Sequence, residues 1–183
     1  DPGIDTAKLY GYQSTFIAKY DSSGNYVWAK SLDGSPGQTE TEKIVVTNTG
    51  IYIAGHFFLN VDFDPGPGTA ILNSIGGWSG DEDIFIAHYD LNGNYIWAKS
   101  MGGLNEDQAL DMALDNNNNI YITGYFRNTV DLDPGVGIAS FIFFPSLTFI
   151  IWILLALAVM RPFRLNEWVL CLLGITTPFY FYA

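Results

Sequence analysis

Two copies of one unit make up most of this sequence, and that repeat limits the fold more than any other feature. Residues 85–137 align with residues 16–68 without a gap at a constant offset of 69 positions, and about half of the aligned residues are identical. The run FIAKYDSSGNYVWAKS, from Phe16, returns as FIAHYDLNGNYIWAKS, from Phe85. Self-similarity at a fixed spacing indicates that one supersecondary unit recurs. We therefore expect a modular chain.

Each copy reads as short strands separated by turns. Aromatic and β-branched runs predict strands, and no stretch before residue 140 has a helical period. The Asn92-Gly93 step predicts a tight hairpin turn of the primed type, and Gly55 and Gly124 predict a bend or a close backbone approach. The predicted strands cover residues 16–20, 26–31, 43–47, 51–57, 112–115 and 120–126.

This pattern favours an all-β repeat of the β-propeller kind. Several antiparallel strands per unit, rich in large aromatic residues, are typical of propeller blades more than of a sandwich. About two blades cannot close a ring, so we expect an incomplete propeller with open sheets and exposed edges. The second copy loses its similarity to the first near Ile138, and Asp1-Pro2-Gly3 matches the end of a copy. We therefore expect the chain to be a fragment.

Charge separates the chain into two parts. Residues 1–140 hold 18 of the 19 acidic residues and six of the eight Lys and Arg, and residues 141–183 have only three charged side chains. Residues 1–140 are acidic enough to repel phosphate groups, which argues against nucleic acid as a partner. The single Cys171 excludes a disulfide framework within the chain, and no signal peptide is expected at the N-terminus.

A family resemblance adds to this interpretation. The runs GNYVWAKS and GNYIWAKS, the runs IYIAG and IYITG, and the recurring Asp-Pro-Gly turns resemble the bacterial β-propeller repeats called SBBP repeats. The resemblance covers most of residues 1–137, although this unit is longer than the usual repeat of that family. It implies a secreted or cell-surface location and a binding or structural role without known catalysis.

The V-D-x-D-P-G motif is the best candidate for a ligand site. Asp62 and Asp64 in the first copy, and Asp131 and Asp133 in the second, lie two residues apart on an extended segment, so each pair shares one face. Calcium takes six to eight oxygen ligands, of which two carboxylates and turn carbonyls supply about half. These residues are therefore candidate calcium ligands. The alternative is that they cap a Pro-Gly turn and protect a sheet edge from pairing.

Other chemically active side chains are less informative. His56 aligns with Tyr125, which indicates an aromatic packing role, and His88 aligns with Lys19, which indicates a solvated strand face. Trp28 and Trp97 recur at one position and favour packing between blades over sugar stacking. No nucleophile–His–acid set, phosphate loop or zinc spacing is present, so we expect no catalytic activity.

The C-terminal part predicts a membrane segment. Phe141 to Met160 is a run of 20 uncharged residues, about 30 Å long as a helix, and a second apolar run extends from Trp168 to Ala183. Residues 141–183 are thus predicted to form a transmembrane helical hairpin whose second helix is truncated. Part of this stretch resembles an uncharacterised family of bacterial multi-pass membrane proteins. The abrupt change from repeat sequence to apolar sequence within a copy is also what an artificial join of two unrelated protein sequences would produce.

These inferences define one function and two alternatives. The chain is predicted to be a non-catalytic extracellular or cell-surface module, anchored to a membrane by residues 141–183, that binds a protein or a glycan. One alternative is a fragment of a propeller enzyme acting on glycans, whose site lies in other blades. The other is a membrane protein segment artificially joined to a repeat fragment.

Overall fold

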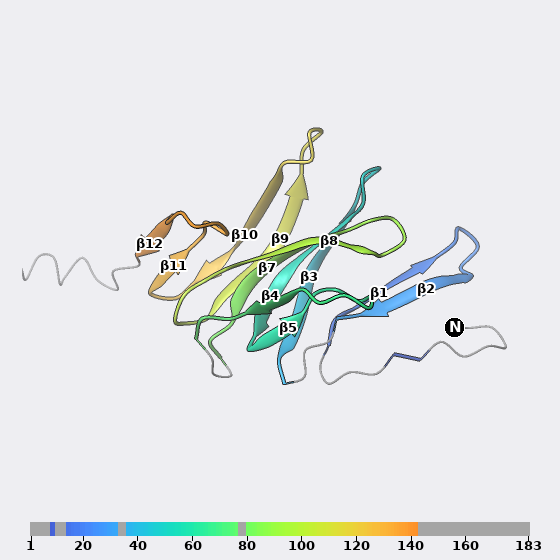
Figure 1. Cartoon of the computed structure of the whole chain (residues 1–183). Coiled ribbons are helices and arrows are strands. Elements are labelled where there is room, and N and C mark those ends of the chain that lie inside the picture. Colours follow the sequence, from blue (N-terminus) through green and yellow to red (C-terminus); the bar gives the residue numbers. More distant parts are fainter. Residues whose placement is uncertain (1–7, 10–13, 33–35, 77–79, 143–183) are drawn as a thin grey trace, which may run out of the picture. The chain divides into compact units, whose positions relative to one another are not determined.

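The structure, a computed structural model, describes residues 8–9, 14–32, 36–76 and 80–142 (Figure 1). Within these ranges the chain forms strands, turns and loops, and no helix. The first copy supplies β1 (Phe16–Tyr20), β2 (Tyr26–Ser31), β3 (Gln38–Val46), β4 (Ile51–Phe58), β5 (Asn60–Asp62) and β6 (Ile71–Asn73). The second supplies β7 (Asp83–Tyr89), β8 (Tyr95–Met101), β9 (Asp107–Leu114), β10 (Ile120–Phe126), β11 (Thr129–Asp131) and β12 (Ser140–Ile142).

The strands largely confirm the prediction, and each strand of the second copy follows its counterpart at the sequence offset. The predicted bounds 16–20, 26–31 and 120–126 are those of β1, β2 and β10. Strands β3 and β9, however, begin at Gln38 and Asp107, well before the predicted residues 43 and 112. The early residues of β3 are mostly polar, so pairing with β4 extends the strand where no apolar pattern marks it.

The structural repeat continues beyond the point where sequence similarity was expected to stop. Strands β11 and β12 pair as β5 and β6 do, with Val130 opposite Phe141 where the first copy has Val61 opposite Leu72. The sequence similarity ends near Ile138, but the backbone pairing of the first copy continues through Ile142. Ladder hydrogen bonds use main-chain groups, so this pairing tolerates the changed side chains.

The central sheet takes two strands from each copy. Its order is β3-β4-β7-β8, with all neighbours antiparallel, and Ile53 of β4 lies opposite Ala87 of β7 (Figure 1). This four-stranded sheet therefore straddles the boundary between the sequence copies. Strands β1 and β2 form a two-stranded sheet that corresponds to β7–β8 of the central sheet. Strands β9 and β10 form another, which corresponds to β3–β4.

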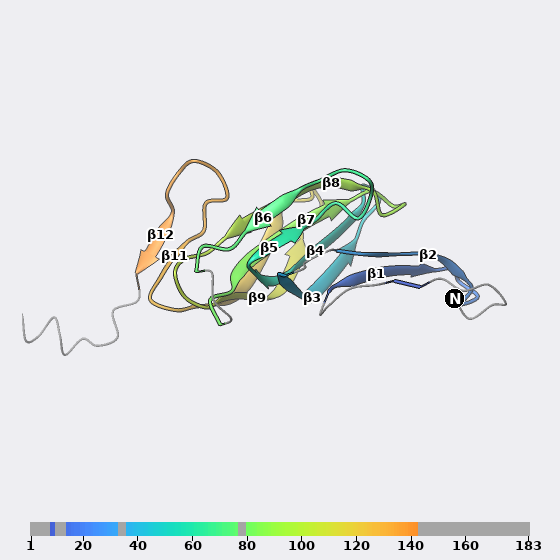
Figure 2. The same ribbon diagram turned by 60° about the horizontal axis from the view of Figure 1, so that its bottom comes forward.

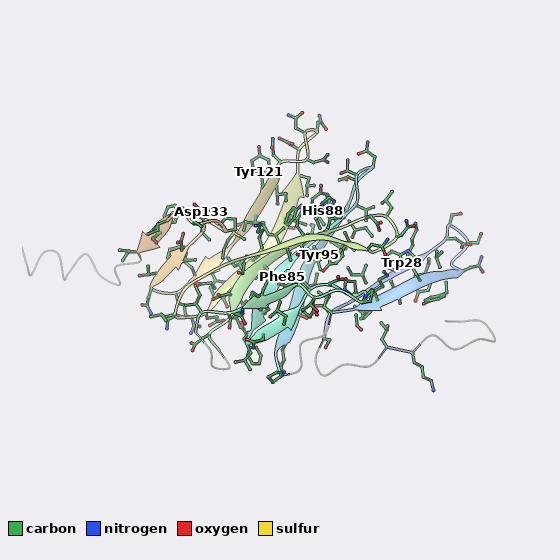
Figure 3. All side chains as sticks on the ribbon, in the orientation of Figure 1. Trp28, Phe85, His88, Tyr95, Tyr121 and Asp133 are labelled. Atoms are coloured by element: carbon green, nitrogen blue, oxygen red, sulfur yellow. The ribbon has the colours of Figure 1, made fainter. Side chains whose placement is uncertain are left out.

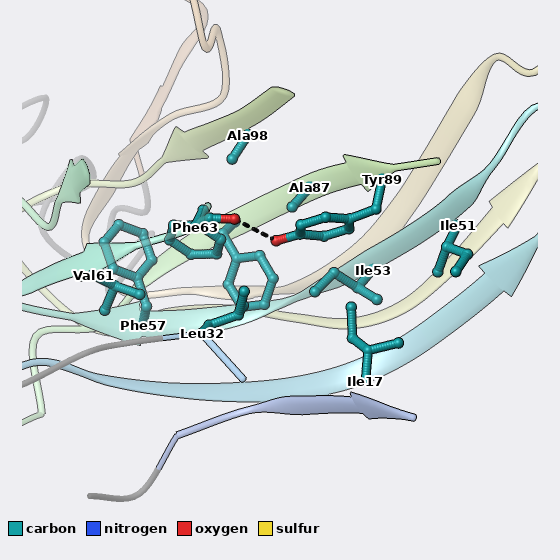
Figure 4. Packing of buried hydrophobic residues seen from close by; sticks show 11 residues of the cluster. Ile17, Leu32, Ile51, Ile53, Phe57, Val61, Phe63, Ala87, Tyr89 and Ala98 are labelled. Atoms are coloured by element: carbon teal, nitrogen blue, oxygen red, sulfur yellow. Dashed lines mark hydrogen bonds between the residues drawn. The ribbon is translucent and has the colours of Figure 1, made fainter. Parts of the chain in front are cut away.

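The two inner strands of the central sheet, β4 and β7, are buried on both faces. One face belongs to cluster 1, which joins the sheet to Ile17 of β1 and Leu32 after β2. The other belongs to cluster 2, which joins it to Ala109 and Met112 of β9. Cluster 1 consists of Ile17, Leu32, Ile51, Ile53, Phe57, Val61, Phe63, Phe85, Ala87, Tyr89 and Ala98 (Figure 4). Cluster 2 consists of Tyr52, Ala54, Ile84, Ile86, Met101, Ala109 and Met112.

Strand β4 illustrates the prediction that these strands are apolar on both faces. Ile51 and Ile53 lie in cluster 1, whereas the alternating Tyr52 and Ala54 lie in cluster 2. Successive side chains point to opposite faces, so a strand between two packed layers needs apolar residues throughout. The short sheet β5–β6 lies beside the central strands, with β6 in contact with β8 (Figure 2).

Aspartate-led turns close three of the hairpins. In the β1–β2 turn, Asp21 Oδ1 accepts hydrogen bonds from the backbone N–H groups of Ser23 and Asn25, and Oδ2 accepts one from the Asn25 side chain. The turns that begin at Asp90 and Asp115 repeat this network. The hairpins are confirmed, but the primed turn type is wrong. Among the residues of the Asp90 turn only Gly93 has a positive φ, 75°, whereas a type I′ turn needs two.

The predicted transmembrane hairpin is not shown. Phe141 and Ile142, expected to begin the first helix, lie in β12 and pair with β11. Among the described residues no helix is long and apolar enough to cross a membrane. Residues 143–183, on which the rest of that prediction falls, lie outside the described residues. The fold class as predicted, a β repeat followed by a helical hairpin, is corrected to an all-β repeat.

Gly55 and Gly124 occupy matching positions where two backbones approach closely. A Cβ at Gly55 would overlap the carbonyl oxygen of Glu40, and one at Gly124 would overlap that of Gln108. Both lie at register shifts, between Thr41 and Lys43 in β3 and between Thr123 and Gly124 in β10. The predicted close approach is confirmed.

We expect Gly55→Ala to destabilise the protein by about 1–3 kcal/mol, because the added methyl group meets backbone that cannot move without breaking the β3–β4 ladder. Urea denaturation followed by tryptophan fluorescence measures the loss. Gly24→Asn is the matched control, since Gly24 has a φ of 82° but nothing within 4 Å of an added Cβ. Equal stability of Gly55→Ala and the parent would contradict the close approach.

Candidate functional site

The Asp-Pro-Gly turns use their aspartates to hold the backbone. Asp62 Oδ1 accepts hydrogen bonds from the N–H of Asp64, at 3.0 Å, and of Ala70, at 2.7 Å. Asp64 Oδ1 accepts one from Gly66, at 2.8 Å. These bonds close the loop between β5 and β6, which is the turn-capping role left as the alternative to calcium binding.

The second copy reproduces this arrangement. Asp131 Oδ1 accepts from the N–H of Asp133 and Ala139, at 3.0 and 2.8 Å, and Asp133 Oδ1 accepts from Gly135 at 2.7 Å. A Cβ at Gly137 would overlap Asp133 Oδ2, so the loop folds closely around this carboxylate. The structure therefore brings together the members of each aspartate pair, but in both pairs the Oδ1 atoms already accept main-chain donors.

Calcium binding at these turns stays a prediction. The Oδ2 atoms and turn carbonyls are the freest ligands for an ion, because Asp62 Oδ1 and Asp131 Oδ1 each accept two main-chain hydrogen bonds. In the part of the chain that the structure describes, no group of three or more His, Cys, Asp or Glu side chains could hold a metal ion.

If calcium binds, millimolar Ca²⁺ should raise the melting temperature, and the double variant Asp62→Asn, Asp64→Asn should remove the part of the rise that comes from the first turn. Differential scanning fluorimetry with Mg²⁺ as the control ion measures the shift. An unchanged melting temperature in the parent protein would eliminate the calcium site.

A pocket of about 260 Å³ brings the second aspartate pair close to another acid. It is lined by Asp131, Asp133, Asp83, Met101, Gly102 and Ser100, among others. The pocket thus lies between the β11–β12 turn, the start of β7 and the end of β8. Two predicted site residues therefore line the same pocket as Asp83, an acid that the sequence analysis did not single out.

Asp83 is a buried acid at the start of β7. It is 1% exposed, and its Oδ2 accepts a hydrogen bond from the N–H of Ile75 at 2.9 Å. Burial raises the pKa of Asp83 to about 7, the Ile75 N–H opposes this rise, and the nearby Asp107 carboxylate adds to it.

Asp107, at the start of β9, is a second buried acid. It is fully buried, and its Oδ1 accepts a hydrogen bond from the N–H of Arg127 at 3.2 Å. Burial raises the pKa of Asp107 to about 6. The sequence signal for both acids is an acidic pair immediately before an apolar strand, Glu82-Asp83 and Glu106-Asp107. That pattern alone does not show which acid turns inward.

The two histidines are both buried, in different surroundings. His56 Nε2 lies 3.6 Å from Glu40 Oε2 and 3.8 Å from Glu82 Oε2, beside a pocket of about 90 Å³. His88 stacks on Tyr52 with ring centroids 4.0 Å apart, and burial lowers its pKa. The predicted solvated face for His88 is therefore wrong. Its counterpart Lys19 lies on the outer strand pair, whereas β7 is covered on both faces.

Both tryptophans pack against the buried clusters, which agrees with the predicted packing role. Trp28 of β2 packs against cluster 1, and Trp97 of β8 packs against cluster 2. A Cβ at Gly93, in the β7–β8 turn, would lie 2.9 Å from the Trp28 ring, so the indole rests on that glycine. Lys30 Nζ donates to Asn94 Oδ1 of the same turn at 3.1 Å. The β1–β2 hairpin thus contacts the β7–β8 hairpin of the next copy.

The two buried acids stabilise the protein less as pH rises. Their folded-state pKa values lie above the unfolded value of 3.8, so the folded protein holds extra protons from about pH 4 to 7. These two acids should therefore stabilise the protein more at pH 5 than at pH 8, whereas the lowered pKa of His88 acts in the opposite direction. The melting temperature at pH 5 minus that at pH 8 should become smaller in Asp83→Asn than in the parent, and Glu42→Gln, at an exposed position, serves as the control. An unchanged difference in Asp83→Asn would contradict the predicted burial effect.

Comparisons with known proteins support the repeat character. The chain is 32% identical over 122 residues to the uncharacterized WD repeat-containing protein L264 of Acanthamoeba polyphaga mimivirus, and 28% identical over 134 residues to the regulatory protein FlaEY of Caulobacter vibrioides. These alignments cover 65% and 73% of this chain but only 8% and 13% of the relatives. No model of a known protein family matches, and no solved structure matches. The chain is thus an all-β repeat similar to short parts of much longer proteins, one of them named for its WD repeats.

Proposed function

We propose that this chain is part of a propeller-type array that works as a non-catalytic binding or structural module. The observation that carries the proposal is the central sheet, in which β3 and β4 of one copy pair with β7 and β8 of the next. Four-stranded antiparallel sheets stacked face to face are the building plan of propeller blades. Similarity to a WD repeat-containing protein agrees with this plan.

A protein partner fits this proposal best. Repeat arrays of this kind provide extended surfaces built on a rigid scaffold, and their loops tolerate change because packing between blades supplies the stability. The buried acids and histidines are engaged in the scaffold itself. Asp83 and Asp107 accept main-chain hydrogen bonds, and His88 stacks within the core. We place the module outside the cell or at the cell surface, which is what the resemblance to SBBP repeats implies.

Binding and turnover experiments test the proposal together. The full chain should bind saturably to a component of the source organism's cell surface, measured by biolayer interferometry, and should not hydrolyse a panel of polysaccharides. The key controls are Asp83→Asn and Asp107→Asn, which neutralise the two acids with raised pKa values. Hydrolysis in the parent that disappears in either variant would overturn the non-catalytic role and favour the glycan-active enzyme instead.

A further inference from the structure

Strand β10 has a neighbour on one side only. Within the described residues it pairs with β9, whereas its counterpart β4 pairs with both β3 and β7. The two strands have nearly the same sequence, IYITGYF in β10 and IYIAGHF in β4. Residues 51–57 of β4 are buried throughout, but Tyr121 and Tyr125 of β10 are exposed, by 60% and 38%. Two things differ: β4 has β7 as a second neighbour, and β9 covers its Tyr52 face, whereas in the described residues β10 has neither a second neighbour nor a layer over Tyr121 and Tyr125.

The first copy shows what this neighbour contributes. Strand β7 inserts Phe85, Ala87 and Tyr89 into cluster 1, where the Phe85 and Phe63 rings lie 4.9 Å apart. The Tyr89 hydroxyl donates a hydrogen bond to the carbonyl oxygen of Phe63 at 3.0 Å (Figure 4). This insertion leaves Phe57 only 1% exposed.

The second copy provides the same receiving surface without that insertion. Met101, Ile120, Ile122 and Leu132 take the places of Leu32, Ile51, Ile53 and Phe63, and all four belong to cluster 2 or pack against it. Phe126, the counterpart of Phe57, is 36% exposed. In the described part of the chain, no side chain takes the places of Phe85, Ala87 and Tyr89.

Strand β1 has the sequence that this surface would receive. It reads FIAKY where β7 reads FIAHY from Phe85. In the described residues β1 pairs only with β2, and Phe16 and Tyr20 are 67% and 53% exposed. Because Ile17 holds β1–β2 on the cluster 1 face of the central sheet, this hairpin cannot also reach β10 of its own chain. Trp28 on β2 and Tyr121 on β10 lie on opposite sides in Figure 3.

We propose that β1–β2 of a second copy of this chain pairs with β10 and completes a four-stranded blade in the order β9-β10-β1-β2. The register of β7 on β4 places Tyr20 of the second copy opposite Ile120, Lys19 opposite Tyr121 and Phe16 opposite Gly124. Phe16, Ala18 and Tyr20 then fill the gap in cluster 2, with the Tyr20 hydroxyl donating to the carbonyl oxygen of Leu132. An unpaired strand edge is a ready template for such addition.

The turn contacts extend the same correspondence. As Trp28 rests on Gly93, Trp97 would rest on Gly24 of the second copy, where nothing within 4 Å opposes an added atom. The contact joins the β1–β2 hairpin of one copy to the β10 edge of another. Each added copy therefore leaves one free hairpin and one free β10 edge at the ends of the assembly. Such a heterologous contact builds rings or open chains rather than a two-fold dimer. This inference concerns self-association and does not depend on the proposed binding role.

Register-specific cross-linking tests the proposal in the full chain. The background is Cys171→Ser, which removes the sole cysteine. One chain carries Lys19→Cys and the other Tyr121→Cys, both at exposed positions, and the mixture is oxidised with copper phenanthroline. The matched control replaces Lys19→Cys with Val27→Cys, an exposed position one strand further from β10. We expect the mixed disulfide dimer to form at least several times faster with Lys19→Cys than with the control.

Further variants keep the test independent of non-specific aggregation. A chain carrying both Lys19→Cys and Tyr121→Cys should give a ladder of dimers, trimers and longer species on a non-reducing gel. Phe16→Glu with Tyr20→Glu should abolish the ladder without lowering the melting temperature, because both side chains are exposed in the single chain. Equal cross-linking in the control, a closed dimer without longer species, or a monomeric internal disulfide would each overturn the proposal.

Discussion

The antiparallel pairing of β4 with β7 is the contact on which the rest of the structure depends. It joins the two sequence copies into one sheet and creates the two faces on which clusters 1 and 2 form. Without it, each copy would present only two-stranded ribbons, which are at best marginally stable in water. Phe85, Ala87 and Tyr89 reach cluster 1 only because β7 lies beside β4, and the Tyr89 hydroxyl then satisfies a carbonyl at the base of the Asp-Pro-Gly turn.

Because the central sheet is shared by two copies, the same residues experience different environments in the two halves of the described chain. Strand β4 is buried on both faces and both edges, while β10 keeps one open edge and an exposed face. Unpaired strand edges normally need protection, and natural sheets cover them or blunt them with charge. On β10 the exposed side chains are mainly aromatic, as expected for a surface that is built to be covered.

The candidate site shows why local sequence patterns are weaker evidence for chemistry than for fold. The aspartates of the V-D-x-D-P-G motif recur because their carboxylates tie down backbone N–H groups in both turns. Asp83 and Asp107, which have no comparable motif, are the acids whose ionisation is most altered, because folding removes them from water. His88 was expected in solvent because it aligns with Lys19, but alignment does not carry information about how many layers cover a strand.

Residue patterns alone predict the repeat, the positions of most strands, the hairpin at Asn92-Gly93, the close backbone approach at Gly55 and the packing role of Trp28. These features depend on residues near one another in the chain, or on recurrence at a constant offset. The fold adds the pairing of β4 with β7, the continuation of the backbone repeat to Ile142, and the burial of Asp83, Asp107 and His88. Strand pairing across copies, and the burial that it produces, depend on contacts between residues far apart in the chain. Local sequence patterns do not predict such contacts.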